Sequence, residues 1–198
     1  AANKTYDGTS TAVITTGTLS GFIGSEKVSA SASGNFDSKN AGVRTATAIY
    51  TLGDDSVSGG LSGGLAGNYT LSDKSLLSAT ISPKVLSATA NAAGKTYDAS
   101  TTASVSLSGL SGLVGTETLG VSAAGSFDTK NAGTGKTVTV NSVALQDGAN
   151  GGLASNYQLA SGQTATADIA RATLSVSGSI AANKTYDGTS TAVITTGT

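Results

Sequence analysis

Several of the residues on which reactive sites depend are missing from this chain. Its 198 residues include no Cys, His, Met or Trp and one Pro. Without Cys or His, it cannot form a Ser-His-Asp or Cys-His nucleophile system, a disulfide framework or the usual kind of zinc site. The composition therefore predicts a protein that is not an enzyme.

Charge and long apolar runs are also scarce. Only 12% of the residues are charged, and the formal net charge is −1 at pH 7, so no basic surface is available for nucleic acid or an anionic membrane. No apolar run approaches the roughly 20 residues that a membrane-spanning helix needs. We expect neither nucleic-acid binding nor membrane insertion.

The residues that are present favour strands and turns. Thr, Val and Ser are abundant, 27 residues are Gly, and no segment sustains a helical period. Hydrophobic residues make up 38% of the chain, which argues against disorder. The composition predicts a folded all-β protein.

An internal repeat is the strongest signal in the sequence. Three landmarks recur in the same order at a spacing of about 90 residues, which is too long for a solenoid rung and suits a small independent domain. The landmarks are Lys-Thr-Tyr-Asp at Lys4, Lys95 and Lys184, Phe-Asp-x-Lys-Asn-Ala-Gly at Phe36 and Phe127, and Asn-Tyr-x-Leu at Asn68 and Asn156.

The closing residues 181–198 repeat residues 1–18 letter for letter. We therefore expect a duplicated pair of unlike modules, and a parent protein with more copies, of which this chain is an internal piece. The predicted divisions are a first module at 1–86, a second at 87–175 and the opening strands of a third at 176–198. The first module passes through Pro83 directly into the second, which predicts a semi-rigid, elongated rod.

Alternation of small apolar and polar residues places the main strands. Val28 and Phe36 share one parity with Ala30 and Ala32, the pattern of a half-buried strand. A hairpin partner follows, with Ala46 and Ala48, or Val138 and Val140 in the second copy, on its inner face. Further strands are expected at 11–18, 68–71, 76–81 and 85–89, and a long surface loop at 53–67. We predict tandem small β-sandwich-like modules, with β-grasp-like modules as the alternative.

Polar residues of the repeated motifs are predicted to form turns, because Asp, Asn and Gly supply side-chain to backbone hydrogen bonds and positive φ. An Asp pair such as Asp7 and Asp37 could serve a glycosidase, but its recurrence in every module favours architecture. The predicted turn residues are Asp7, Gly8, Asp37, Asn40 and Gly42, and in the second copy Asp98, Asp128, Asn131 and Gly133.

Four tyrosines could either pack inside the modules or contact a ligand such as a sugar. They are Tyr6, Tyr69, Tyr97 and Tyr157. No cofactor is expected. Structural calcium at Asp54, Asp55 or residues 147–151 is a lesser alternative, because neither loop has the spacing of an EF-hand or a calcium-binding β-roll.

A Lys, a Glu and an Asn recur together, as Lys4, Glu26 and Asn40 and then as Lys95, Glu117 and Asn131. Such a trio could form a Lys-Asn isopeptide crosslink assisted by the acid. The simpler interpretation is a turn-capping Asn with an exposed Lys and an exposed Glu.

Taken in order, these motifs resemble the YDG-type repeat modules of large secreted bacterial adhesins, including filamentous-haemagglutinin-like exoproteins. The resemblance carries no catalytic residues and implies a secreted or cell-surface stalk that spaces out a distal adhesive domain. Its partners would be neighbouring modules. The alternative is self-association with identical chains, or polysaccharide binding, that builds a fibre or biofilm matrix.

Overall fold

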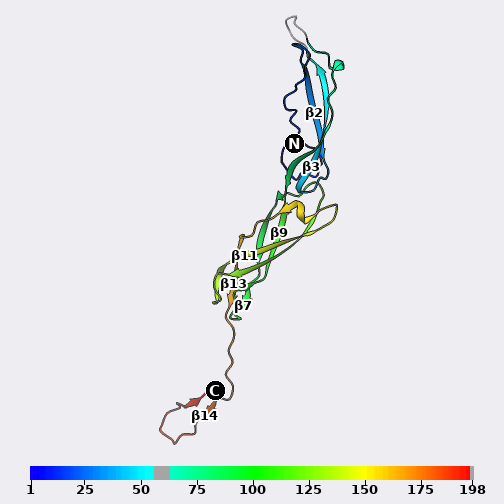
Figure 1. Cartoon of the computed structure of the whole chain (residues 1–198). Helices are drawn as coiled ribbons and strands as arrows, with labels where there is room; N and C mark the ends of the chain where they lie inside the picture. The colour runs from blue at the N-terminus through cyan, green and yellow to red at the C-terminus, as the bar shows by residue number, and fades with distance from the viewer. Residues whose placement is uncertain (56–62, 197–198) are drawn as a thin grey trace.

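The computed structural model describes residues 1–55 and 63–196 (Figure 1). Within these residues the regular structure consists of β-strands and two short 3-10 turns, η1 (Ala66–Asn68) and η2 (Ala154–Asn156), with no α-helix. The predicted all-β class is confirmed. The described part also lacks the helix that a β-grasp module would place across its sheet.

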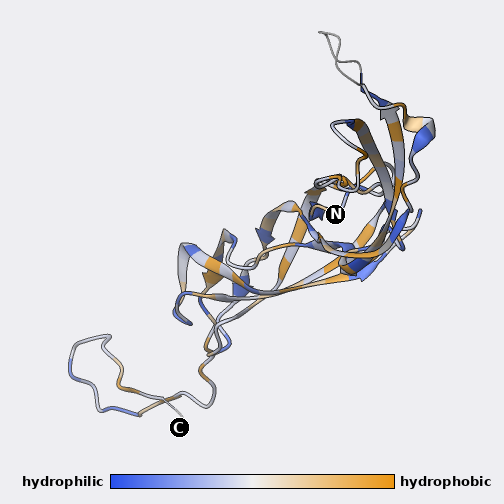
Figure 2. Ribbon diagram, turned by 45° about the horizontal axis from the view of Figure 1, so that its top comes forward, coloured by the Kyte–Doolittle hydropathy of each residue, from blue (hydrophilic) through white to orange (hydrophobic). Residues whose placement is uncertain are grey.

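The first module is built on one four-stranded sheet in the order β1-β4-β3-β2, which curls strongly (Figure 2). The short β1 lies parallel to β4, and the other neighbours are antiparallel. The strands are β1 (Lys4–Thr5), β2 (Val28–Phe36), β3 (Gly42–Asp54) and β4 (Lys74–Ser82).

Side-chain alternation explains why β2 and β3 form a hairpin with one buried face. Val28 and Phe36 are buried at the two ends of β2, and polar residues between them face solvent. On β3, Ala46 and Ala48 are completely buried, and Phe36 pairs with Ala46. The alternation, the hairpin and its inner alanines are confirmed.

The second module repeats this plan with a five-stranded sheet in the order β7-β13-β11-β10-β8. Val138 and Val140 on β11 are buried in place of the two alanines. The strands are β7 (Lys95–Thr96), β8 (Thr102–Ala103), β10 (Leu119–Phe127), β11 (Gly133–Asp147) and β13 (Thr164–Ala170).

A second antiparallel layer covers part of this sheet. It consists of β6 (Ser87–Ala92) and β9 (Val105–Ser111), which contact β13 and β10 respectively. The two layers give the second module the sandwich-like form that the sequence predicts.

Among the described residues of the first module, no second layer is assigned. Residues 11–18 form the isolated bridge from Thr11 to Asn35, and the Val13 carbonyl accepts from the N–H of Ala2. Residues 68–71 contain no strand. Both strand predictions are wrong for the first module, because these scattered bonds do not continue into a ladder. Of the predicted loop at 53–67, residues 56–62 lie outside the described residues.

The chain crosses between the modules in an extended conformation. Strand β4 ends at Ser82, Pro83 follows, and β5 (Lys84–Val85) pairs in parallel with β12 (Tyr157–Gln158) of the second module. The predicted boundary at residue 86 stays a prediction, and the structure places residues 84–86 against the second module.

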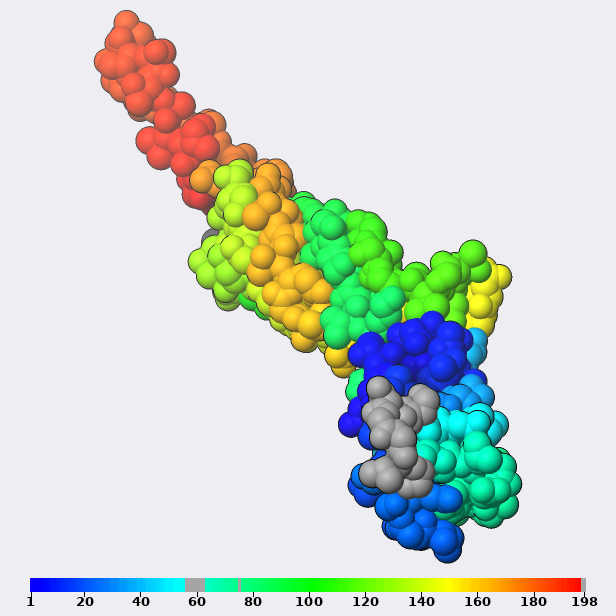
Figure 3. Space-filling model, turned by 90° about the horizontal axis from the view of Figure 1, so that it is seen from above, coloured from blue at the N-terminus to red at the C-terminus, as the bar shows by residue number. Residues whose placement is uncertain are grey.

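Beyond the second module, the chain continues as a thin tail. Its strands β14 (Ile180–Ala181) and β15 (Ile194–Thr195) pair with each other, and every described residue from 171 onward is exposed. The tail stands away from the body (Figure 3). In the described residues, no helix is long and apolar enough to cross a membrane.

Candidate functional site: the joint between the modules

Each copy of the Lys-Thr-Tyr-Asp motif folds into the same turn. Lys4 Nζ lies 2.8 Å from Asp7 Oδ1 and donates to the Thr9 carbonyl at 3.0 Å. The backbone N–H and the hydroxyl of Thr9 both donate to Asp7 Oδ1 at 2.9 Å. Because the turn recurs in the exposed tail, it depends on local residues alone. The equivalent groups are Lys95, Asp98 and Ser100, and Lys184, Asp187 and Thr189.

The position after the Asp has positive φ in every copy: +81° at Gly8, +64° at Ala99 and +72° at Gly188. Ala99 therefore adopts a left-handed conformation that its Cβ disfavours, at some cost in strain. At Gly8 a second constraint applies, because a Cβ there would lie 2.8 Å from Val114 Cγ1 in the second module. Gly8 thus allows the two modules to approach closely.

A buried carboxylate joins the two modules. Tyr6 of the first module donates its hydroxyl to Glu117 Oε1 at 2.6 Å, and Tyr157 of the second donates to Glu117 Oε2 at 2.6 Å. The two rings meet edge to face, with centroids 5.4 Å apart. Only 1% of Tyr6, 4% of Tyr157 and 8% of Glu117 is exposed. Short hydrogen bonds to a charged acceptor are among the stronger ones in proteins.

Burial and the neighbouring carboxylate keep the two phenols, Tyr6 and Tyr157, protonated. Burial, followed by the hydrogen bond to Glu117, raises the pKa of Tyr6 above its ordinary value of 10.0. The same two causes raise the pKa of Tyr157. Both phenols therefore keep their protons, and Glu117 accepts from both.

Asn156 makes a second polar contact across the modules. Its side chain is fully buried. Its Nδ2 donates to Asn40 Oδ1 at 3.1 Å, and the backbone N–H of Ala41 donates to its Oδ1 at 2.8 Å. Arg44 steadies the receiving loop, because its guanidinium donates to the carbonyls of Asn40 and Ala41.

Apolar side chains from both modules enclose these polar groups. We call the whole contact the joint. Leu86, from the crossing segment, is 4% exposed and belongs to the same buried cluster as Tyr6 and Tyr157. The first module contributes Ala12, Phe36, Ala46, Ala79 and Ile81, and the second contributes the partly buried Leu110, Leu113, Val114, Leu119, Leu145 and Leu159.

The remaining predicted turn residues lie between the hairpin strands or, for Gly42 and Gly133, at the first residue of the second strand. The backbone N–H of Asp37 donates to Thr45, and Lys136 Nζ lies 2.8 Å from Asp128 Oδ1. Gly42 has a φ of +133°. Its equivalent Gly133 does not have positive φ, and the register of β11 shifts between this residue and Lys136.

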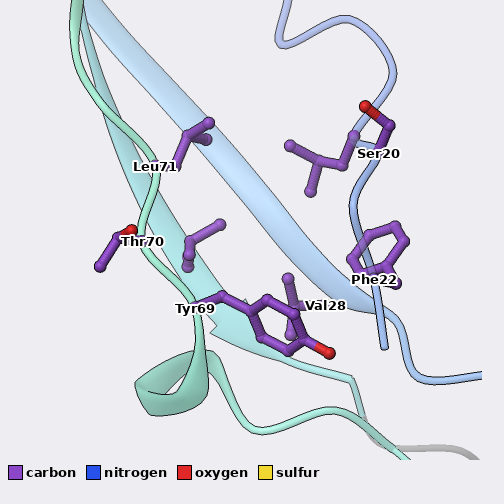
Figure 4. A pocket seen from close by; sticks show the side chains of 8 residues that line it. Ser20, Phe22, Val28, Tyr69, Thr70 and Leu71 are labelled. Atoms are coloured by element: carbon purple, nitrogen blue, oxygen red, sulfur yellow. The ribbon is translucent and has the colours of Figure 1, made fainter. Parts of the chain in front are cut away.

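Tyr69 lies at the opposite end of the first module, beside Glu26, the other Glu of the chain. Its hydroxyl donates to Glu26 Oε2 at 2.7 Å and accepts from the N–H of Ile23 at 3.2 Å. The hydrogen bond to Glu26 raises the pKa of Tyr69. Phe22 meets the Tyr69 ring edge to face at 5.9 Å, and both rings border a pocket (Figure 4).

Tyr97 lies at the far end of the second module. It is 37% exposed and lines an open pocket of about 440 Å³ together with Asn131, Arg171 and Leu174. The four predicted tyrosines thus fall into three places: two in the joint and one at each outer end.

The recurring trio of Lys, Glu and Asn is not brought together. Lys4 bonds to its own turn, Asn40 to Asn156, and Glu26 to Tyr69. The expectation that the Glu residues are exposed is wrong for Glu117, because it bonds to two tyrosines inside the joint. The sequence holds one signal that Glu117 has a structural role, because the only two Glu residues occupy equivalent places in the two modules.

In the two loops considered for calcium, carboxylates accept hydrogen bonds from backbone N–H groups. Asp54 Oδ1 accepts from the N–H of Ala66, and Asp147 Oδ1 from the N–H of Ala154, both at 2.7 Å. Across residues 1–55 and 63–196, no three acidic side chains gather in a group that could hold a metal ion.

Two like all-β modules that share a buried joint define the chain as a tandem-repeat protein. The chain belongs to the YDG domain family, whose model matches residues 1–76 and 82–167. Comparison with curated proteins and with solved structures found no match.

Proposed function

We propose that this chain is a non-catalytic, semi-rigid stalk of a secreted or surface-exposed bacterial adhesin. The observation that carries the proposal is the joint, in which Tyr6 of one module and Tyr157 of the next bond to one buried carboxylate. A spacer needs length and resistance to bending. Modules in series supply the length, and the buried contact between them resists bending.

Two separate connections support stiffness. The chain itself crosses as an extended segment, in which β5 pairs with β12. Directly before β12, Asn156 bonds to the loop that carries Asn40 and Ala41, which belongs to the first module. A hinge at Pro83 would have to break the second connection, so bending exposes buried polar groups and costs free energy.

The placement of the recurring carboxylates supports a structural role. Asp7 and Asp98 are bonded to the lysines of their own turns, and Glu117 to two phenols. Each is used in the architecture of the repeat. In this proposal the main partners of a module are its neighbours in the same chain.

Polysaccharide binding through the four candidate tyrosines would have to use two of them. Tyr6 and Tyr157 are buried in the joint, and Tyr69 and Tyr97 keep surface for a sugar.

The stalk role is tested by shortening the parent protein. Deleting one pair of modules should shorten the surface molecule seen by electron microscopy by the length of that pair, and adhesion at its tip should persist. Loss of adhesion in a correctly exported, shortened protein would contradict a spacer and favour binding by the repeats. A matched deletion of two pairs checks that length falls in equal steps.

A further inference from the structure

The chain leaves each module along a strand that lies parallel to the strand of its Lys-Thr-Tyr-Asp motif. In the first module, β1 pairs with the end of β4, where Lys4 lies opposite Ile81. One residue further on, the N–H of Tyr6 donates to the Ser82 carbonyl at 2.8 Å. Pro83 follows at once, so the strand that enters the sheet and the strand that leaves the module lie side by side.

The second module repeats this arrangement at the equivalent positions. Strand β7 pairs in parallel with the end of β13, with Lys95 opposite Ile169, and the N–H of Tyr97 donates to the Ala170 carbonyl at 2.8 Å. The crossing segment is held in a similar way, because β5 lies parallel to β12. Parallel pairs therefore recur along the path of the chain, whose two modules are arranged end to end (Figure 1).

The parallel direction of these pairs decides how a module responds to tension. Pulling on the chain before β1 and after β4 draws the two strands in opposite directions along their length. The hydrogen bonds of the ladder run from strand to strand, so this shear loads all of them together. An antiparallel pair in the same place would open from one end, one bond after another.

Side chains beside the pair add to its resistance against sliding. Ile81 on β4 is completely buried, and Tyr6, directly after β1, is 1% exposed and bonds to Glu117. The Oδ1 of Asn3 accepts from the N–H of Thr80 at 2.8 Å, which extends the contact by one bond. Sliding β1 past β4 would break these bonds and draw Tyr6 out of the joint, at a cost in free energy.

We propose that the modules bear tensile load, and that the parallel pair of β1 with β4, like its equivalent of β7 with β13, is the contact that resists it. Forced unfolding is governed by the rate of unfolding, and shear of the pair raises the barrier to that step. This inference goes beyond the stalk role and does not depend on it, because resistance to tension is a property of the chain itself and is measured on it.

Pulling on single molecules of the 198-residue chain through two chosen residues tests the proposal. The chain has no Cys, so two introduced cysteines become its only anchoring thiols. In one chain, Ala1→Cys and Val85→Cys draw β1 against β4 in shear. In a second chain, Thr18→Cys replaces the first anchor, so the load reaches β1 from the end beside the exit of β4 and opens the pair bond by bond.

The rupture force of the first module should be several-fold higher in the shear chain than in the chain anchored at Thr18, at the same pulling rate. The two chains contain the same strands and differ in the direction of the load. All three anchor residues are exposed, so the urea midpoints of the two chains should agree. Equal rupture forces would overturn the proposal.

A matched pair of substitutions in the shear chain tests which bonds carry the load. Asn3→Ala removes the bond to Thr80 and should lower the rupture force. Asp73→Ala is the control, because Asp73 Oδ1 also accepts from one backbone N–H, that of Tyr50 at 3.0 Å, but lies before the opposite end of β4. It should leave the rupture force unchanged. Equal rupture forces in these two variants would contradict the assignment of the load to this pair.

Discussion

Two equivalent tyrosines in this chain have opposite surroundings. Tyr6 is 1% exposed and bonds to Glu117, whereas Tyr97 is 37% exposed and lines an open pocket. In the tail, Tyr186 reaches 93% exposure although its turn keeps the same lysine to aspartate bond. The turn is local, but burial of its tyrosine requires a neighbouring module.

The difference shows that a module of this kind carries half of a core at each end. Glu117 and Tyr157 are buried under the first module, while Glu26 and Tyr69 make the same bond, partly buried, at the outer end of the first module. Stability should therefore depend on where a residue lies in the array as well as on its type, as in other repeat proteins.

The largest effect is expected from removing the tyrosine at the covered position. Tyr6→Ala should lower the free energy of unfolding by about 3 kcal/mol or more, the scale for deleting a buried aromatic side chain. Tyr97→Ala should cost less than about 1 kcal/mol because its ring is already exposed. Urea denaturation of both variants measures the difference. Equal losses in the free energy of unfolding would contradict the difference between the covered and the open tyrosine.

A smaller effect is expected from the two glutamates. Glu117→Gln removes a charge that accepts two hydrogen bonds, and should cost about 1 to 3 kcal/mol because the remaining buried groups lose a full partner. Glu26→Gln should cost less, since the Tyr69 pair is only partly buried and water replaces the lost bond. If the Glu26 variant proved the less stable of the two, the joint would not be the buried centre described here.

Alkaline pH should weaken the joint. The pKa of Tyr6 is raised by burial and then by the bond to Glu117, so the folded protein holds this proton more tightly than the unfolded chain does. Its contribution is therefore complete below pH 10 and is lost as the pH rises above 10. The urea midpoint should fall as the pH rises from 10 to about 11, and less steeply in Tyr6→Phe. Tyr97→Phe, outside the joint, should keep the native slope.

The smallest effect on stability is expected at the Lys-Asp turns, which have the same bonds in both modules and in the tail. The hydrogen bond from Lys95, with those from Ser100, lowers the pKa of Asp98 to about 2. Its contribution is present above the ordinary value of 3.8 and is lost as the pH falls toward 2. Asp98→Asn should therefore flatten the acid side of the stability profile slightly. An unchanged profile would show that the turn contributes nothing measurable.

The strand pattern of each module could be predicted because it depends on nearby residues. The alternation from Val28 to Phe36 and the inner positions of Ala46 and Val138 follow from a period of two. The turn at Asp7 follows equally from the chemistry of Lys, Asp and Thr within one short segment.

The joint could not be predicted because its partners are distant in the sequence. Tyr6 and Glu117 are brought together only by the packing of two modules, so no local pattern marks Glu117 as buried. Residues 11–18 also look like a strand, but they form only scattered backbone bonds, to β2 and to Ala2, that do not continue into a ladder.

The central claim is that the joint holds the two modules in one orientation. Nitrogen-15 relaxation of the backbone amides, at a low protein concentration, measures this directly. The account predicts that amides of both modules fit one anisotropic tumbling rate, and that Tyr6→Ala separates them into two. Independent tumbling of the modules before the Tyr6 substitution would contradict it.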